Sequence, residues 1–343
     1  MLISQIVLAT SLLVFFLFVF KKFNILKDNA LSSSHKKIIN IDNSPVLIGG
    51  IFLFCCMLIF ISNNFTSLKI FGFLILCLGI LSDKNIIHNP QIRIVIQILI
   101  LIIFVKSNRL QIEEIRIAFL DSLLQNGYFN VFFTVFCLAI LLNGSNFIDG
   151  LNGLTTGYYI LIFSVIFYLY FSNSSIKIDN LIEFKILIIC MLIFLAFNIF
   201  GKCFLGDGGA YLISFLAGYF FIKFYNLNLL ISPYFIALLL WYPAFETLFS
   251  LIRRSVSKFN VSSADNLHLH HLILFYLKTK ILNNYINPIT SMLIIFYNFL
   301  IFIISLNFVN NSKIMIILIL VNILNYVILY NYLSNLNTKN FKS

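Results

Sequence analysis

The sequence predicts an all-α, polytopic integral membrane protein. Of its 343 residues, 61% are hydrophobic, 17% are aromatic and only 10% are charged, and the mean hydropathy is +1.00. A soluble fold has no means of hiding that much apolar surface from water. Apolar runs long enough to cross a bilayer recur along the chain, with short polar segments between them. These observations exclude an ordinary soluble globular protein.

Counting the apolar runs predicts about eleven transmembrane helices in a single domain, residues 1–343. The first run ends at Lys21 and Lys22. It is too long for a signal-peptide core and lacks a small-residue cleavage site, so we expect it to remain as a span. The third and fourth runs are short, which suggests that they continue into flanking polar residues. The predicted spans are residues 2–20, 46–62, 67–82, 93–107, 127–143, 156–172, 183–200, 209–226, 228–249, 288–307 and 313–331.

The distribution of positive charge predicts the orientation. With eleven spans, one face collects fifteen of the 23 Lys and Arg residues. By the positive-inside bias this face is cytoplasmic, the N-terminus is outside and the C-terminus is cytoplasmic, although Lys106, Arg109 and Arg116 argue the other way. The net charge of +11 then reflects topology and attraction to the lipid bilayer, and nucleic acid is not expected as a partner. The predicted cytoplasmic loops are residues 21–45, 83–93, 144–155, 201–208 and 250–287.

Polar, glycine-rich clusters interrupt the apolar runs. The segment Asn143–Gly157 reads NGSNFIDGLNGLTTG and carries one carboxylate, Asp149. Irregular backbone at membrane depth needs a reason, and an ionisable residue there indicates a functional site. A tight turn is the simpler interpretation, because Asp-Gly and Asn-Gly are common turn dipeptides. Convergence on the predicted cytoplasmic face favours a shared site; the other clusters there are Ser44-Pro45 with Gly49-Gly50, Ser82-Asp83, Gly206–Gly209 and His268–His271.

The segment FLGDGGAYL, Phe204–Leu212, places Asp207 in a glycine-rich turn before a span. Missing side chains let backbone N–H groups approach a phosphate, and the following helix offers its positive end. Asp207 is therefore a candidate ligand for Mg²⁺ that bridges a diphosphate. The alternative is a helix N-cap, where Asp is favoured.

Three histidines, His268, His270 and His271, crowd into the longest predicted cytoplasmic loop. The nearby sequence offers no Cys and, among acids, only Asp265, so a closed zinc site is not indicated. In an extended segment His268 and His270 would point the same way and could donate hydrogen bonds to phosphate oxygens. A solvated histidine-rich loop is the alternative.

Asp83 ends the third predicted span, and Arg93 opens the fourth. A carboxylate and a cation at a membrane surface suit an anionic lipid headgroup and a group that manages its proton. Ordinary helix-end charges would look similar.

These motifs together resemble the polyprenyl-phosphate N-acetylhexosamine-1-phosphate transferases of glycosyl transferase family 4. The chain matches that family's NxxNxxDGLxGL signature at Asn143, Asn146, Asp149–Leu151 and Gly153-Leu154, and its FNxxPAxxFxGDxGS segment at Phe197–Leu212. SPVLIGG, residues 44–50, and ADNLHLHHL, residues 264–272, are similar to two further family motifs. The HxHH form resembles the branch that begins O-antigen, common-antigen and teichoic-acid linkage-unit synthesis more than the peptidoglycan-precursor branch.

The resemblance implies an enzyme of the bacterial inner membrane with a cytoplasmic active site, multi-pass in the bilayer; it leaves a homodimer open. The substrates would be a UDP-N-acetylhexosamine, or a deoxy analogue, and undecaprenyl phosphate, and Mg²⁺, or Mn²⁺, would be the cofactor. The implied products are UMP and a lipid-linked diphosphosugar that initiates cell-envelope polysaccharide synthesis. The implied catalytic residues are Asp83, Asp149 and Asp207, with Asp207 also the metal ligand, and the implied substrate-binding residues are Asn146, Asn152, Asn198, Phe204, Arg93, His268, His270 and His271.

The chain departs from the family pattern at four positions. Ser82 stands where the family commonly has a second Asp, Asn152 where it has Asp, Asn266 where it often has Arg, and Glu246 where it often has Asp. Ser82 puts in doubt any role that needs two adjacent carboxylates. These changes motivate the alternative of a catalytically inactive scaffold.

Two other functions compete with the sugar-phosphate transferase. A transporter or flippase for lipid-linked sugars would carry polar residues near the bilayer midplane and often shows repeated halves, neither of which the sequence predicts. A phospho-N-acetylmuramoyl-pentapeptide transferase is the second alternative, within the same family. The identity of the sugar is not indicated.

Overall fold

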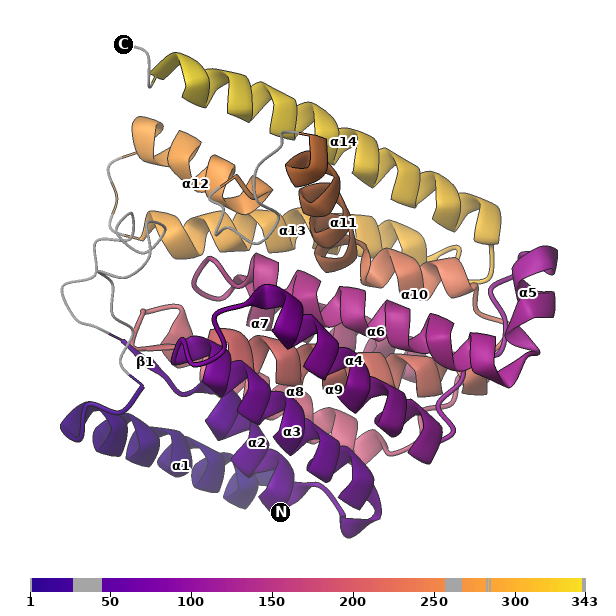
Figure 1. Ribbon diagram of the computed structural model, residues 1–343, viewed down its shortest axis with the longest axis horizontal. Coiled ribbons are helices and arrows are strands. Elements are labelled where there is room, and N and C mark those ends of the chain that lie inside the picture. The colour runs from indigo at the N-terminus through magenta and orange to yellow at the C-terminus, as the bar shows by residue number, and fades with distance from the viewer. Residues whose placement is uncertain (1, 27–44, 257–266, 282, 284, 341–343) are drawn as a thin grey trace.

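The computed structural model describes residues 2–26, 45–256, 267–281, 283 and 285–340, apart from the side chains of residues 2, 256 and 337–340. In these residues almost all regular structure is helical (Figure 1). The helices are α1 (Leu2–Lys22), α2 (Gly49–Phe60), α3 (Thr66–Asp83), α4 (Pro90–Ser107), α5 (Ala118–Leu124), α6 (Gly127–Ile148), α7 (Leu154–Ser172), α8 (Leu181–Asn198), α9 (Gly206–Leu227), α10 (Pro233–Leu239), α11 (Trp241–Val256), α12 (Leu269–Lys280), α13 (Ile286–Leu306) and α14 (Ser312–Asn340).

The described helices include nine that are long and apolar enough to cross a membrane, or ten if α10 and α11 form one broken span. The prediction of eleven spans is therefore corrected, although each predicted run does contain helix. The run at residues 46–62 yields only the 12-residue α2. At 1.5 Å per residue α2 covers about 18 Å, short of the ~30 Å hydrocarbon core.

The predicted span at residues 228–249 is two helices, α10 and α11, bent by 73°. Pro243 explains the break, because proline lacks an N–H and its ring clashes with the carbonyl four residues earlier. That carbonyl belongs to Leu239, the last residue of α10, and it accepts a hydrogen bond from the Tyr158 hydroxyl at 2.9 Å. The backbone group that proline leaves without a helical partner is thus satisfied by α7.

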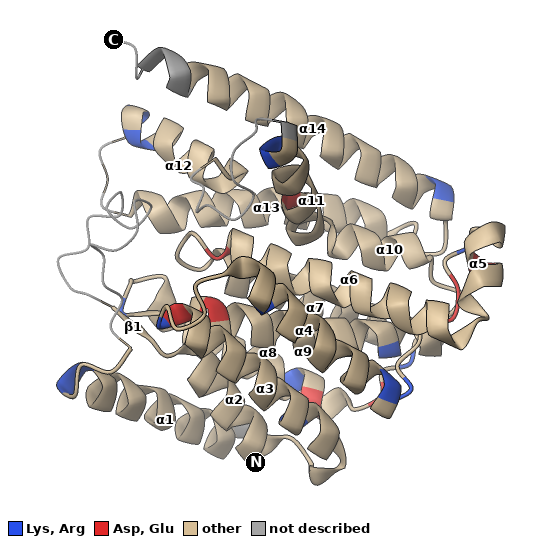
Figure 2. Ribbon diagram, viewed as in Figure 1, with Lys and Arg blue, Asp and Glu red and all other residues tan. Residues whose placement is uncertain are grey.

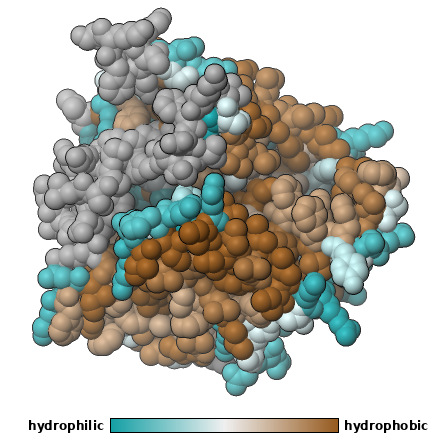
Figure 3. Space-filling view, in the orientation of Figure 1, coloured by the Kyte–Doolittle hydropathy of each residue, from teal (hydrophilic) through white to brown (hydrophobic). Residues whose placement is uncertain are grey.

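The surface and the interior are both apolar, as expected for a protein in lipid. α9 lies at the centre, with 72% of its span buried, and packs against α2, α3 and α6. α1 and α14 lie on opposite sides of the bundle, with 11% and 17% buried (Figure 1). Figure 3 shows hydrophobic residues over the middle of one face and most of the hydrophilic ones toward its edges. The chain is an all-helical polytopic membrane protein.

Charged residues gather mostly toward the two ends of the long helices (Figure 2). Two cations on the predicted outer face bind backbone carbonyls at helix ends. Arg116 donates to the carbonyls of Leu229, Leu230, Ile231 and Asn310, at 2.7–3.3 Å. Lys69 donates to the carbonyl of Ile61 at 2.7 Å, at the C-terminal end of α2. These contacts give both side chains a structural reason to lie where the positive-inside bias disfavours them.

Candidate active site

The carboxylate of Asp83, at the end of α3, lies against the start of α9. Its Oδ1 accepts the backbone N–H of Asp207 at 3.0 Å, and its Oδ2 accepts that of Gly208 at 3.3 Å. These N–H groups have no partner within the helix, and a negative charge is favoured at this end of the helix dipole. We expected the N–H groups of the glycine-rich turn to be offered to a phosphate, but Asp83 takes two of them.

Glycines allow this close approach. A Cβ on Gly79 of α3 would lie 2.2 Å from the Cα of Gly208, and a Cβ on Gly50 of α2 would lie 2.6 Å from the N of Gly209. Gly206 has φ of +74°, and a Cβ there would lie 2.8 Å from Oδ2 of Asp83. Side chains at these positions would separate α2 and α3 from the start of α9.

A short parallel pair of strands joins two of the sequence motifs. β1 (Val46–Leu47) pairs with β2 (Cys203–Phe204), with Val46 opposite Cys203 and Leu47 opposite Phe204. Phe204 is half-buried and lies two residues before Gly206, where α9 begins. The described part of the early motif, from Pro45 onward, is next to the Asp207 segment; Ser44 lies outside the described residues.

Asp207 faces a serine and an arginine. Its Oδ2 accepts a hydrogen bond from Oγ of Ser82 at 2.5 Å and lies 3.1 Å from Nη1 of Arg93. Arg93 also donates to the Ser82 hydroxyl. The side chains of Arg93 and Asp207 are 22% and 26% exposed, so this ion pair is only partly screened by solvent. The structure thus brings together Asp83, Arg93 and Asp207, which the sequence predicted to share a site.

A line of polar contacts extends inward from this cluster. Gln97, one turn beyond Arg93 and fully buried, accepts from Nδ2 of Asn143 at 2.9 Å. Asn146, one turn further along α6, donates to the Tyr211 hydroxyl at 3.3 Å. Sequence reasoning missed Gln97 and Tyr211. Their spacing four residues after Arg93 and Asp207 places each on the same helix face as those residues, and that signal was available.

The loop at Asp149 is shorter than predicted. α6 continues to Ile148, Asp149 caps its C-terminus, and α7 begins at Leu154, so only five residues interrupt the helices. Asn198 connects this loop to β2: its Oδ1 accepts from the N–H of Gly153 at 2.7 Å, and its Nδ2 donates to the carbonyl of Cys203 at 2.8 Å. The N–H of Asn152 is held by Asn287 at 2.8 Å.

The three histidines cover this loop. His268 has extended backbone, but His270 and His271 lie in the first turn of α12. The extended segment expected to align His268 with His270 is therefore not formed, yet the two rings are parallel, with centroids 5.6 Å apart. A Cβ on Gly150 would lie 2.6 Å from Nε2 of His270 and 2.6 Å from Cε1 of His271. Asn266, the departure from the family motif beside them, lies outside the described residues.

Burial lowers the pKa of His270 well below its usual value, and charge on His271 and His268 would lower it further. His270 is therefore neutral at pH 7, because its folded-state pKa lies below the pH. A neutral ring donates from only one nitrogen. His270 thus contributes a hydrogen-bonding group to the site, without a positive charge.

The donor atoms near Asp207 suit a hard cation. Asp207, Asp83 and Ser82 present carboxylate and hydroxyl oxygens, which Mg²⁺ and Mn²⁺ prefer. In the part of the chain that the structure describes, no group of three His, Cys, Asp or Glu side chains is placed to hold a metal. The residues therefore fit an ion held by one or two carboxylates that takes its remaining ligands from phosphate and water.

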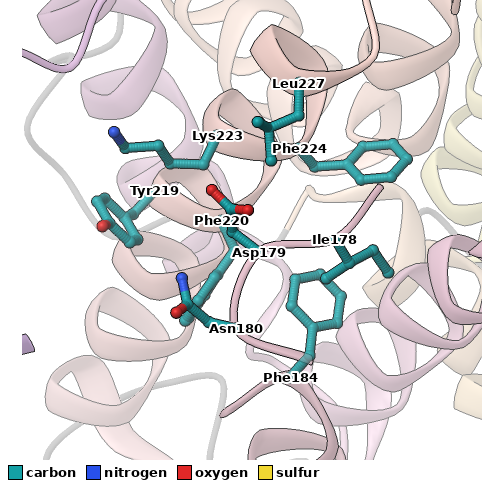
Figure 4. A pocket seen from close by; sticks show the side chains of 9 residues that line it. All are labelled: Ile178, Asp179, Asn180, Phe184, Tyr219, Phe220, Lys223, Phe224 and Leu227. Carbon is teal, nitrogen blue, oxygen red and sulfur yellow. The ribbon is translucent and has the colours of Figure 1, made fainter. Parts of the chain in front are cut away.

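A separate cavity of about 100 Å³ lies at the other end of α9. Asp179 and Asn180, before α8, and Tyr219 and Lys223 of α9 are among its lining residues (Figure 4). None of the predicted site residues lines it. We therefore place the candidate active site at the N-terminal end of α9.

Comparison with known families shows which proteins this chain is similar to. The model for glycosyl transferase family 4 matches residues 65–225, a segment that contains Asp83, Arg93, Asp149 and Asp207. This segment of the chain is similar to glycosyl transferase family 4. The matched segment runs from the start of α3 to near the end of α9, so the family likeness covers the helices that build the site.

Several curated proteins also align with this chain. A probable undecaprenyl-phosphate N-acetylglucosaminyl 1-phosphate transferase of Bacillus subtilis is 30% identical over 64% of this chain and 60% of its own length. Undecaprenyl-phosphate α-N-acetylglucosaminyl 1-phosphate transferases of Thermotoga maritima and Yersinia pestis are 27% and 26% identical, each over 66% of this chain. The alignments cover 66% and 65% of those two relatives, so each relative is matched over less than two thirds of its length.

Gly79 provides a test of the packing beneath the candidate active site. In Gly79→Ala the added methyl group meets backbone of α9, so α3 must shift; overpacking of this kind typically costs about 1–3 kcal/mol. Gly72→Ala, two turns earlier on α3, is the matched control, because its nearest contact would be a Leu212 methyl at 3.3 Å. Thermal unfolding in detergent should show a lower Tm for Gly79→Ala alone. Equal Tm values for both variants would contradict the account of this packing.

Proposed function

We propose that this protein transfers N-acetylhexosamine 1-phosphate from a UDP-sugar to undecaprenyl phosphate and releases UMP. The observation that carries the proposal is the Asp83–Asp207–Arg93 cluster at the start of α9, at one end of a lipid-embedded bundle. The relatives named above are undecaprenyl-phosphate N-acetylglucosaminyl 1-phosphate transferases, so UDP-N-acetylglucosamine is the first donor to test. The product would be a lipid-linked diphosphosugar that initiates envelope polysaccharide synthesis.

The reaction exchanges one phosphoanhydride for another. A phosphate oxygen of the lipid attacks the β-phosphorus of the UDP-sugar, the bond to the bridging oxygen breaks, and UMP leaves with that oxygen. A phosphate monoester has a second pKa of about 6 and is largely ionised at pH 7. No strong base is then required, so positioning and charge neutralisation carry most of the rate.

Each residue of the cluster at the start of α9 has a different role in this reaction. Arg93, partly exposed at the N-terminal end of α4, binds the phosphate of the lipid as it enters from the bilayer. Asp83 fixes the backbone of Asp207 and Gly208, so that the Asp207 carboxylate is presented in one position. Asp207 would hold Mg²⁺, or Mn²⁺ in its place, and the bound ion would neutralise charge on the diphosphate.

The second part of the site recognises the sugar nucleotide. Uridine rests against the loop that contains Asn152, with Asn146 beside it and Phe204 available for stacking. Asp149 lies partly exposed where this loop begins, and we assign it a catalytic role beside the phosphates. Asn198 holds the loop against β2 through its two backbone contacts, and His268, His270 and His271 close it from the other side.

Product analysis tests the proposal. Purified protein is incubated with undecaprenyl phosphate and a panel of UDP-sugars that includes UDP-N-acetylmuramoyl-pentapeptide, and released nucleotides are separated. We expect UMP with at least one UDP-N-acetylhexosamine and with Mg²⁺ present. UDP as the product would indicate transfer of the sugar without its phosphate, and activity with the pentapeptide alone would indicate the peptidoglycan-precursor reaction. No turnover with any donor would favour a transporter or scaffold.

Asp207→Asn tests the metal ligand. The amide keeps the size of the side chain but loses the charge, so we expect UMP release to fall at least ~100-fold, the scale of one electrostatic group in an active site. Asp121→Asn is the matched control, since Asp121 binds the N–H of Ile115 at 2.7 Å near the opposite end of the bundle. If Asp207→Asn turned over as fast as Asp121→Asn, the metal role would pass to Asp149 or Asp83.

We further propose a cytoplasmic active site, an outside N-terminus and a cytoplasmic C-terminus in the bacterial inner membrane, from the charge bias. The exposed residues Lys202 and Ser175 lie in loops on opposite predicted faces. In spheroplasts, an impermeant maleimide should label Ser175→Cys, and Lys202→Cys should react only after lysis; the unsubstituted chain gives the background from its six cysteines. The opposite pattern would place the site outside.

A further inference from the structure

A second group of buried polar side chains lies behind the histidines. Glu246 of α11 is fully buried, and its Oε1 lies 2.8 Å from Nδ1 of His268. Its Oε2 accepts a hydrogen bond from the hydroxyl of Tyr326, in α14, at 2.8 Å. Ser250, one turn along α11, lies 3.3 Å from the same nitrogen of His268. A single carboxylate therefore joins α11, the residue that caps α12, and α14.

The contact with Glu246 determines what the His268 ring can do. A carboxylate accepts only, so Nδ1 of His268 must carry the hydrogen that lies between them. In the described part of the chain no hydrogen bond involves Nε2 of this ring. With Nδ1 engaged, Nε2 is the atom left to meet a ligand.

Other contacts place His268 beside the candidate active site. Its ring centroid lies 5.2 Å from that of Phe147, in the last turn of α6, two residues before Asp149. The guanidinium of Arg254 lies 5.5 Å from the same Phe147 ring. The His268 ring is parallel to that of His270, which lies against Gly150. His268 thus lies at the edge of the loop to which we assign the sugar nucleotide.

We propose that Glu246 is a positioning residue for His268: it holds Nδ1–H of the ring, so that Nε2 is presented to the sugar nucleotide. This inference rests on the proposed function for the identity of the ligand. Tyr326 completes the arrangement, because its hydroxyl holds the second oxygen of Glu246 and fixes the plane of the carboxylate. The site thereby depends on α14, which lies outside the segment that the family model matches.

The surroundings of the pair contain few other charges. The titratable or charged groups on the elements packed around it include Tyr242, Arg253 and Arg254 of α11, His270 and His271 of α12, Tyr326 and Tyr330 of α14, and Asp149 at the end of α6. Among these, Arg253 and Arg254 are the cations and Asp149 is the carboxylate. No other described carboxylate contacts His268, so its tautomer is attributed to Glu246.

Glu246→Gln tests the positioning role. The amide keeps the shape of the side chain but can donate as well as accept, so it no longer requires the hydrogen of the ring to lie on Nδ1. We expect kcat to fall about 10- to 100-fold, the loss typical of removing a carboxylate that is hydrogen-bonded to a functional histidine. The KM for the UDP-sugar should change much less. Glu246→Asp retains a carboxylate and should recover most of kcat. Equal losses in both variants, or an unchanged kcat in Glu246→Gln, would overturn the proposal.

Nitrogen-15 NMR of histidine-labelled protein in proteoliposomes gives a readout that does not need activity. The chain has five histidines, and the spectrum of His268→Gln identifies the signals of His268. We expect a protonated Nδ1 in the unsubstituted protein and a changed pattern in Glu246→Gln. An unprotonated Nδ1 in the unsubstituted protein would overturn the proposal even if the enzyme is active. Conversely, the expected NMR pattern without any transferase activity would locate the failure in the proposed function.

Tyr326→Phe separates the positioning role from simple stability. Its matched control is Tyr297→Phe, which also removes one hydroxyl bound to a partner in the helix bundle, here Asn322 at 2.7 Å. Both variants should unfold at similarly reduced temperatures, but only Tyr326→Phe should lower kcat, by a few-fold, and change the His268 signals. Identical kinetic behaviour of the two variants would exclude Tyr326 from the arrangement.

Discussion

The hydrogen bonds from the first turn of α9 to the Asp83 carboxylate are the contacts on which the candidate active site depends. They join the end of one membrane helix to the start of another and fix the direction of Asp207. A carboxylate in this position relative to the helix dipole stabilises the helix by up to about 2 kcal/mol when it is partly buried. Gly79 and Gly206 are required because side chains at either position would separate the two groups. The small residues in these motifs therefore have a structural explanation that is independent of any substrate.

Ser82 changes the charge balance of the same cluster. Its hydroxyl lies 2.5 Å from Oδ2 of Asp207, so a carboxylate at this position would place a second negative charge against the first. Two such groups would raise the pKa of one of them or require a bound cation. Serine donates a hydrogen bond instead, and Arg93 then balances Asp207. With serine at position 82, this cluster carries one negative charge fewer than a pair of carboxylates would give it.

The sequence predicted where helices form better than it predicted which of them are long enough to cross the membrane. Residues 228–249 are apolar on average, and average hydropathy does not register that Pro243 removes the helical partner of the Leu239 carbonyl. Residues 46–62 are also apolar, but Val46 and Leu47 pair with β2 and leave a helix too short to cross. The motifs predicted that Asp83, Arg93 and Asp207 would meet. Gln97, Tyr211 and Tyr326 were missed because the partner of each is distant in sequence.

Reversal of the reaction is the most direct test of the central claim. Because one phosphoanhydride is broken and another is made, the equilibrium constant should lie near unity, and a site that stabilises the transition state must act in both directions. Labelled UMP is added to purified protein with unlabelled UDP-sugar, undecaprenyl phosphate and Mg²⁺. We predict that label enters the UDP-sugar pool and that EDTA prevents it. Failure of the label to enter, in a preparation that consumes the same UDP-sugar, would contradict a transferase that releases UMP.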